Sequence, residues 1–209
     1  VVWMPRADGV LVGFTYNREQ EVLGWHRHDL GGYSDAGHTV AAKVESVTVI
    51  PSSDELSYEV WIVVQRYIGG RSVRYVEVME EPYETGDVQA DAFYVDSGAT
   101  YDGAAVTTIG GLWHVAGETV SILADGAVVP DPVVTALGKI TLEDAASVVQ
   151  VGYSYNSDGQ TLRNNAGAAD GTAQGKIQRK HRIVLRLYET GTLEVGPSFD
   201  ELDEVIFRE

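Results

Sequence analysis

Two histidines separated by one residue, His26 and His28, are the strongest candidates for metal chemistry in the sequence. They fall in a segment predicted as a β-strand, where residues two apart point to the same face, so both imidazoles can bind one zinc or copper ion. Such a site needs further ligands, and His38, His114 and His181 stand in separate segments without the spacing of a known metal motif. A hydrogen-bonded or solvent-facing histidine pair is the simpler interpretation, and the sequence predicts no metal and no cofactor.

Adjacent carboxylates are the second candidate, because glycoside hydrolysis uses two acids. The pairs Glu80/Glu81 and Glu143/Asp144 have the right residue type, but the reaction requires a defined separation across a cleft, which neighbouring residues do not specify. Solvated loop charge is the better interpretation of both pairs. The sequence also contains no G-x-S-x-G elbow, phosphate loop or dinucleotide fingerprint. It therefore predicts no catalytic residues and no enzyme.

Aromatic residues offer a third possibility, the binding of sugars. Trp113, Tyr101, Tyr153 and Tyr155 can form a platform on which sugar rings stack, which would make the chain a carbohydrate- or receptor-binding β-module. Large aromatic side chains also fill hydrophobic cores. We therefore expect these aromatics to lie in the core and keep the sugar platform as the alternative.

One stretch of the chain is locally basic. Residues 163–186 hold six of the fifteen Lys and Arg residues and a single acid, Asp170. Such a cluster can be plain surface, a nucleic-acid contact, or a complement to acids on a neighbouring copy. We favour the contact between copies, with these candidate bases: Lys176, Arg179, Lys180 and Arg182.

Composition narrows the class of protein. The 209 residues carry 15 Lys and Arg against 31 Asp and Glu, a net charge of −16, and no cysteine. Disulfides and thiolate chemistry are therefore excluded, and no run of about 18 apolar residues exists that would span a membrane. Between Tyr75 and Leu162 there are fourteen acids and one base, so this stretch carries −13 of the −16. Because the chain does not start with methionine, we expect it to be a piece of a longer polypeptide.

The elements that position these residues are predicted to be antiparallel strands. Alternating residues such as Val10, Val12, Phe14 and Tyr16 share one strand face, and the turn after them predicts a hairpin. Gly69-Gly70 separates two further strands, since glycine adopts the positive φ angles of a two-residue turn. That turn pairs Val63 with Val76 and Trp61 with Val78, and the apolar face that these four residues form must pack on something. All the strands named so far belong to a predicted first domain, residues 1–82.

A charged segment with proline and glycine, residues 80–91, predicts a domain boundary. Short β-like runs with Asp-Gly turns at Asp102, Asp125 and Asp158 follow, which is typical of a small all-β sandwich or barrel over residues 91–162. Residues 163–209 are predicted to hold a loop, a short helical turn within Thr172–Lys180 and a strand over Arg182–Tyr188. The fold class is all-β.

Many short motifs along the chain, in order, resemble one family. They include the following: Val2-Trp3, Thr15-Tyr16, Trp25-His26-Arg27-His28, Val44-Glu45-Ser46-Val47, Val60-Trp61, Arg74-Tyr75-Val76-Glu77, Leu123-Ala124-Asp125-Gly126, Val151-Gly152-Tyr153 and Arg186-Leu187-Tyr188. Together they are similar to the middle of the tail nozzle proteins (tail tubular protein B type) of short-tailed bacteriophages. The resemblance covers nearly the whole chain.

The resemblance implies a structural virion protein rather than an enzyme. In that family six copies form a ring at the end of the tail, together with other tail proteins, and the genome leaves through the central channel. By resemblance, the first domain supplies strands of propeller-like blades, the acidic module is an insertion, and the last segment returns to the main body. The alternative is a carbohydrate- or receptor-binding module at the tail tip.

A channel for DNA must let phosphates pass without binding them. Carboxylates that face the channel repel phosphate, so no affinity from counterion release builds up. We therefore expect part of the acidic excess to line or rim the channel, with these candidates: Glu80, Glu81, Glu84 and Asp87.

Overall fold

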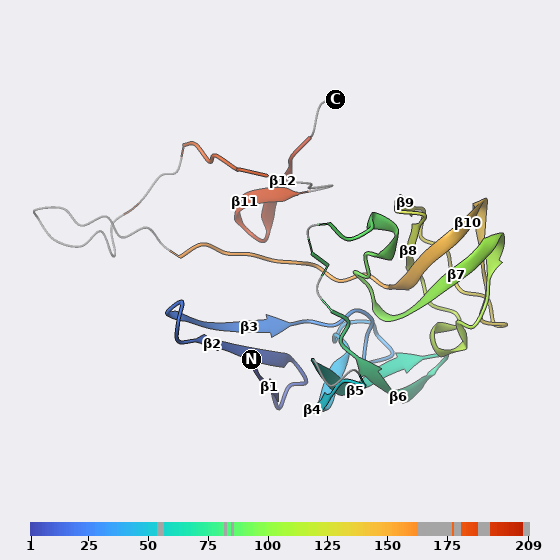
Figure 1. Ribbon diagram of the computed structural model, residues 1–209, viewed down its shortest axis with the longest axis horizontal. Helices are drawn as coiled ribbons and strands as arrows, with labels where there is room; N and C mark the ends of the chain where they lie inside the picture. Colours follow the sequence, from blue (N-terminus) through green and yellow to red (C-terminus); the bar gives the residue numbers. More distant parts are fainter. Residues whose placement is uncertain are drawn as a thin grey trace, which may run out of the picture. The chain divides into compact units, whose positions relative to one another are not determined.

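The computed structural model describes residues 1–53, 57–81, 83–84, 86–162, 177, 181–187 and 193–206. The chain divides into two compact units, Val1–Asp158 and Gly159–Glu209. Antiparallel strands build both units, and the helical elements among the described residues are short 3-10 turns (Figure 1). The predicted all-β class is confirmed. No helix in these ranges has the length and apolar character needed to cross a membrane.

The first sheet has the order β1-β2-β3. Its strands are β1 (Val2–Pro5), β2 (Leu11–Asn17) and β3 (Val22–His28). β2 and β3 form the predicted hairpin, and the Asn17 side chain accepts a hydrogen bond from the Gln20 backbone N–H at 3.1 Å in the turn. The buried face carries Leu11, which is 1% exposed, whereas Tyr16 on the other face is 60% exposed.

The second sheet has the order β4-β5-β6. Its strands are β4 (Lys43–Pro51), β5 (Tyr58–Ile68) and β6 (Arg71–Val78). Gly69 and Gly70 have φ angles of 59° and 80°, so the predicted turn is confirmed. The predicted pairs of Val63 with Val76 and of Trp61 with Val78 are also confirmed.

The two sheets share one hydrophobic cluster, formed by Leu11, Ala42, Val44, Ile62 and Val64. Burying side chains of this size stabilises a fold by roughly 1.5–3 kcal/mol each. The core therefore lies on the Ile62 face of β5 and not on the Trp61 face that the sequence singled out as needing a partner.

The third sheet has the order β7-β10-β8-β9 and is open. Its elements are the 3-10 turns η1 (Gln89–Asp91) and η2 (Trp113–Val115) and the strands β7 (Asp96–Ile109), β8 (Ser121–Ala124), β9 (Ala127–Val129) and β10 (Ile140–Tyr153). A second hydrophobic cluster joins this sheet to Ile68 of β5; its members include Leu112, Val120, Ile140, Val149 and Val151.

This sheet differs from the sequence prediction in strand length. The Asp125 turn is confirmed, but Asp102 lies inside β7. β10 is likewise one strand of 14 residues and not a short run. The Asp125 carboxylate accepts the backbone N–H groups of Ser147 and Val148 at 3.0 and 2.8 Å. These bonds satisfy the backbone where the register shifts, so the strand continues through the irregularity.

The second unit contains a two-stranded sheet of β11 (Glu194–Ser198) and β12 (Glu201–Glu204). Residues 181–187, where a strand was predicted, have no strand structure. The helical turn predicted within residues 172–180 falls outside the described residues, apart from Ile177.

Candidate functional site

The predicted histidine pair lies on one strand face, as expected. His26 Nδ1 and His28 Nε2 are 2.7 Å apart, and His26 Nε2 lies 3.1 Å from the Thr15 hydroxyl. The Trp3 ring contacts both imidazoles, and Gly13 leaves room for the His26 ring, because a Cβ there would lie 2.1 Å from its Cε1. The pKa of His28 is lowered mainly by burial and secondly by the neighbouring His26. Within the described residues no three His, Asp or Glu side chains are placed to hold a metal, so a hydrogen-bonded pair is what the structure contains.

The four acids predicted to face a channel come together. Glu80, Glu81, Glu84 and Asp87 line a cavity of about 600 Å³, here called the acidic cavity, with these other residues: Trp3, Tyr58, Val60 and Met79. The Glu84 backbone N–H donates to Asp87 Oδ2 at 2.7 Å, which fixes the loop that carries both residues. All four acids are exposed or partly exposed, so the rim of this cavity is negatively charged.

The second adjacent acid pair is elsewhere. Glu143 and Asp144 lie on β10, are exposed, and line neither the acidic cavity nor the cavity described below. Consecutive residues of a strand point to opposite faces of the sheet, so these two carboxylates do not face one another, and the arrangement does not match glycoside hydrolysis.

Of the candidate inter-subunit bases, Arg182 is described and is exposed. Lys176, Arg179 and Lys180 lie outside the described residues. A contact between these bases and acids of another copy remains a prediction.

A buried polar centre, which the sequence analysis missed, surrounds Arg66. This side chain is 0% exposed; its Nε donates to the Gly31 carbonyl at 2.9 Å and its two terminal nitrogens bind the carboxylate of Glu77. Its guanidinium also lies over the Tyr153 ring, 5.4 Å from the centroid. The alternation Ile62, Val64, Arg66, Ile68 places one charge on an apolar strand face, which is the pattern that could have revealed it.

Asp96 joins the same centre. Its Oδ2 accepts the Gly31 backbone N–H at 2.6 Å. Burial raises the pKa of this carboxyl. The hydrogen bond from Gly31 and the charge of Arg66 act in the opposite direction, but burial is the larger effect. The loop after β3 is therefore tied to β5 through Arg66 and to β7 through Asp96.

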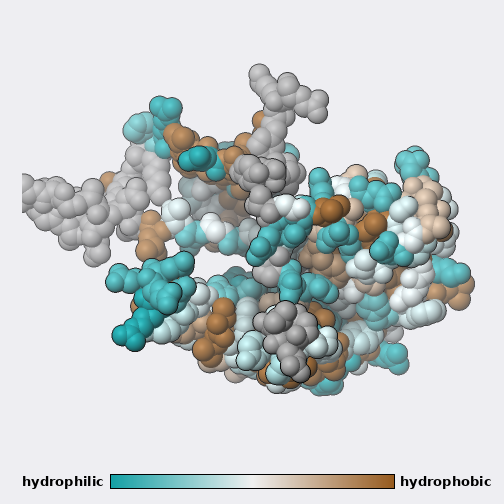
Figure 2. All heavy atoms as spheres, in the orientation of Figure 1, coloured by the Kyte–Doolittle hydropathy of each residue, from teal (hydrophilic) through white to brown (hydrophobic). Residues whose placement is uncertain are grey.

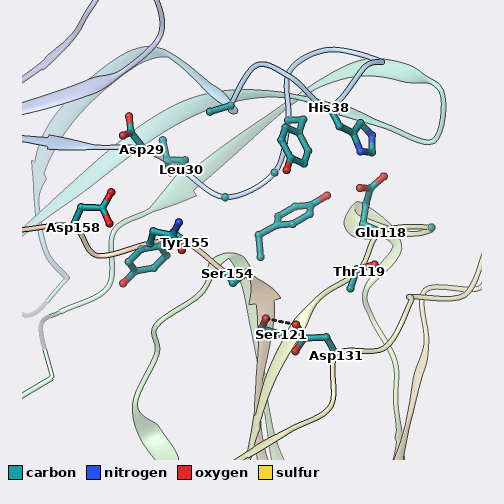
Figure 3. A pocket seen from close by; sticks show the side chains of 17 residues that line it. Asp29, Leu30, His38, Glu118, Thr119, Ser121, Asp131, Ser154, Tyr155 and Asp158 are labelled. Atoms are coloured by element: carbon teal, nitrogen blue, oxygen red, sulfur yellow. Dashed lines mark hydrogen bonds between the residues drawn. The ribbon is translucent and has the colours of Figure 1, made fainter. Parts of the chain in front are cut away.

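Beside this centre is a cavity of about 590 Å³, here called the tyrosine cavity. Three stretches of chain within the first unit form most of its wall: the loop after β3, the segment leading into β8 and the segment after β10 (Figure 3). The described residues that line it include neither lysine nor arginine. Its acids come from separate segments and are Asp29, Glu118, Asp131 and Asp158.

Aromatic side chains form part of the same wall. Tyr33 and His38 stack with ring centroids 4.8 Å apart and an interplanar angle of 8°. Tyr153 and Tyr155, two members of the aromatic platform considered from the sequence, also line this cavity. Trp113 and Tyr101 do not, and Trp113 is 69% exposed on η2. Two of the four residues of the predicted platform therefore line this cavity, and the other two lie elsewhere.

No protein-family model matches the chain, and no curated protein matches it significantly.

Proposed function

We propose that the chain is a structural component of a phage tail, part of a ring that forms the channel for genome ejection. In this proposal the β1–β3 and β4–β6 sheets are propeller-like blades, and the β7–β10 sheet belongs to a small inserted sandwich or barrel domain. The ring contains several copies, six by resemblance, and contacts other tail proteins. DNA passes through it without specific binding, and the protein is located in the virion.

The observation that carries the proposal is the apolar surface left on the two three-stranded sheets. On the first sheet, Leu23 and Trp25 are 66% and 65% exposed, and on the second sheet Val76 is 66% exposed. Apolar residues reach the viewed surface at several places (Figure 2). Sheets that build a blade or a ring bury such faces against neighbouring blades or copies, so uncovered apolar faces favour an assembling protein.

The distribution of charge supports a channel. The four acids of the acidic cavity lie close together, and no described Lys or Arg lines that cavity. A ring of copies repeats this rim around its axis, and a repeated ring of carboxylates repels phosphates and keeps DNA from binding to the wall.

The test compares two charge reversals of equal size in phage particles. Glu80→Lys/Glu81→Lys changes the acidic cavity, and Glu143→Lys/Asp144→Lys changes an adjacent pair outside it. We expect the first variant to slow genome release several-fold at low salt, because lysines bind the passing phosphates, and the effect to shrink as salt is raised. Release is followed by the fluorescence of a DNA-binding dye after receptor triggering.

Two outcomes would count against the proposal. Equal release rates for both variants would show that these acids do not face the channel. Absence of the protein from purified virions, tested by immunogold labelling of the tail, would remove the structural function altogether.

A further inference from the structure

The Tyr153 hydroxyl has no hydrogen-bond partner in the part of the chain that the structure describes. Tyr153 is 6% exposed and belongs to the hydrophobic cluster of the third sheet, yet no described residue forms a hydrogen bond with its hydroxyl. Because the described side chains include no fully buried polar atom that lacks a partner, this oxygen keeps access to the tyrosine cavity that Tyr153 lines. Buried tyrosine hydroxyls normally find a hydrogen-bond partner. A ligand in the cavity would supply one.

The charge of the cavity restricts the ligand. Among the described residues, four carboxylates and no Lys or Arg line it, which disfavours phosphates, sulfates and acidic sugars. Ionised carboxylates only accept hydrogen bonds, so the ligand must bring donors such as hydroxyl groups. A metal ion is a poorer fit, because the described residues include no group of three ligands around one point.

Some of these acceptors are free and others are already used. Asp131 accepts the Ser121 hydroxyl at 3.0 Å, and Asp29 pairs with Arg27 at 2.8 Å. The Glu118 carboxylate, in contrast, forms no hydrogen bond or ion pair with any described residue, and the hydrogen bonds of Glu118 to Val115 and Val134 are made by its backbone. Its carboxylate faces the cavity from the segment before β8 (Figure 3).

The aromatic side chains supply the apolar half of the site. Tyr155 is 38% exposed, and the Tyr33–His38 stack gives the cavity a flat wall. A ligand with hydroxyl groups on its edges and C–H groups on its faces satisfies carboxylates and rings together, and pyranose sugars have this character. A cavity of about 590 Å³ lies within the usual range for small-ligand sites. We propose that the tyrosine cavity binds a neutral saccharide, which Tyr153 and Glu118 hold by hydrogen bonds.

The experiment screens the whole chain against a glycan array that contains neutral oligosaccharides of glucose, galactose and N-acetylglucosamine together with sialylated and sulfated counterparts. Binding of the best neutral glycan is then measured by isothermal titration calorimetry. Tyr153→Phe and Glu118→Gln are each expected to weaken it about 5- to 10-fold and to keep the shape of the side chain. The first removes the hydroxyl, and the second removes the negative charge and replaces one accepting oxygen by an NH2 group, which only donates. Trp113→Ala, outside the cavity, is expected to bind as the wild type does.

Circular dichroism and thermal unfolding establish that Tyr153→Phe is folded before it is titrated, and Glu118→Gln gives an independent measurement at a partly exposed position. The proposal is overturned if no neutral glycan binds at millimolar concentration, or if only acidic glycans bind. It is also overturned if Trp113→Ala abolishes binding while Tyr153→Phe and Glu118→Gln leave it unchanged.

Discussion

The guanidinium of Arg66 satisfies groups from two different parts of the first unit. It neutralises Glu77 on the neighbouring strand and donates to the carbonyl of Gly31 in the loop after β3. A buried ion pair of this kind contributes little net stability compared with apolar residues, but removing one partner leaves the other charge unpaired in the interior. Residues that hold separate segments together in this way act on stability far more than exposed pairs do.

We predict that Arg66→Met lowers the free energy of unfolding by about 3–5 kcal/mol, because the Glu77 carboxylate and the Gly31 carbonyl both lose their donors. The double variant Arg66→Met/Glu77→Leu should lose less than the single variant, since it removes the unpaired charge. Urea unfolding followed by tryptophan fluorescence measures both.

Arg74→Met provides the control. Arg74 pairs with Glu45 at 2.7 Å on the surface, where salt and water screen the interaction. The unfolding midpoint of Arg74→Met should therefore stay close to that of the wild type. Equal midpoints for Arg66→Met and Arg74→Met would contradict the role given to the buried pair.

At the scale of the element, the hairpin between β5 and β6 shows how one turn determines register. Gly69 and Gly70 both adopt positive φ angles, and the two-residue turn they form places Val63 opposite Val76. The register then puts Arg66 and Glu77 on the same face, where their side chains form the buried pair.

We predict that Gly70→Ala destabilises the protein by about 1–2 kcal/mol. A Cβ at this position meets no atom within 4 Å, so the cost comes only from the backbone, whose φ of 80° disfavours an L side chain. Gly24→Ala on β3 is the matched control, because its Cβ also has open space and its φ is not in the left-handed region.

Gly24→Ala should be neutral or stabilising by up to about 1 kcal/mol, since alanine loses less conformational freedom than glycine on folding. Both variants are measured by thermal unfolding. Equal effects at the two positions would show that the turn does not depend on the positive φ angles.

At the scale of the whole molecule, the sequence predicted what local patterns determine. Strand alternation and turn residues are local, so the all-β class, the hairpin whose turn follows Asn17 and the Gly69-Gly70 register were predictable. The buried face of each sheet could not be predicted in this way. β5 carries Trp61 and Val63 on one face and Ile62 and Val64 on the other, so both faces are apolar and alternation cannot choose between them.

Of the two candidate sites, one could be expected from the sequence and the other could not. The acids of the acidic cavity are neighbours in sequence, so their proximity could be expected. The tyrosine cavity combines Tyr33, Glu118 and Tyr153, which are far apart in the chain and meet only through the packing of the sheets. No spacing rule applies to such residues. Of these three, the sequence pattern indicates only Tyr153 as a binding residue.

The uncovered face of the first sheet gives the last prediction. Trp25 is 65% exposed and contacts mainly the Phe14 ring, 4.6 Å away, whereas Leu11 on the opposite face is 1% exposed. Leu11→Ala should therefore cost about 2–5 kcal/mol and Trp25→Ser less than about 1.5 kcal/mol in urea unfolding. If copies pack through this face, Trp25→Ser should also lower the apparent mass in sedimentation velocity at concentrations where the wild type associates. A loss of stability as large as that of Leu11→Ala would mean that the face is part of the core of a single copy, and an unchanged apparent mass would place the contact between copies elsewhere.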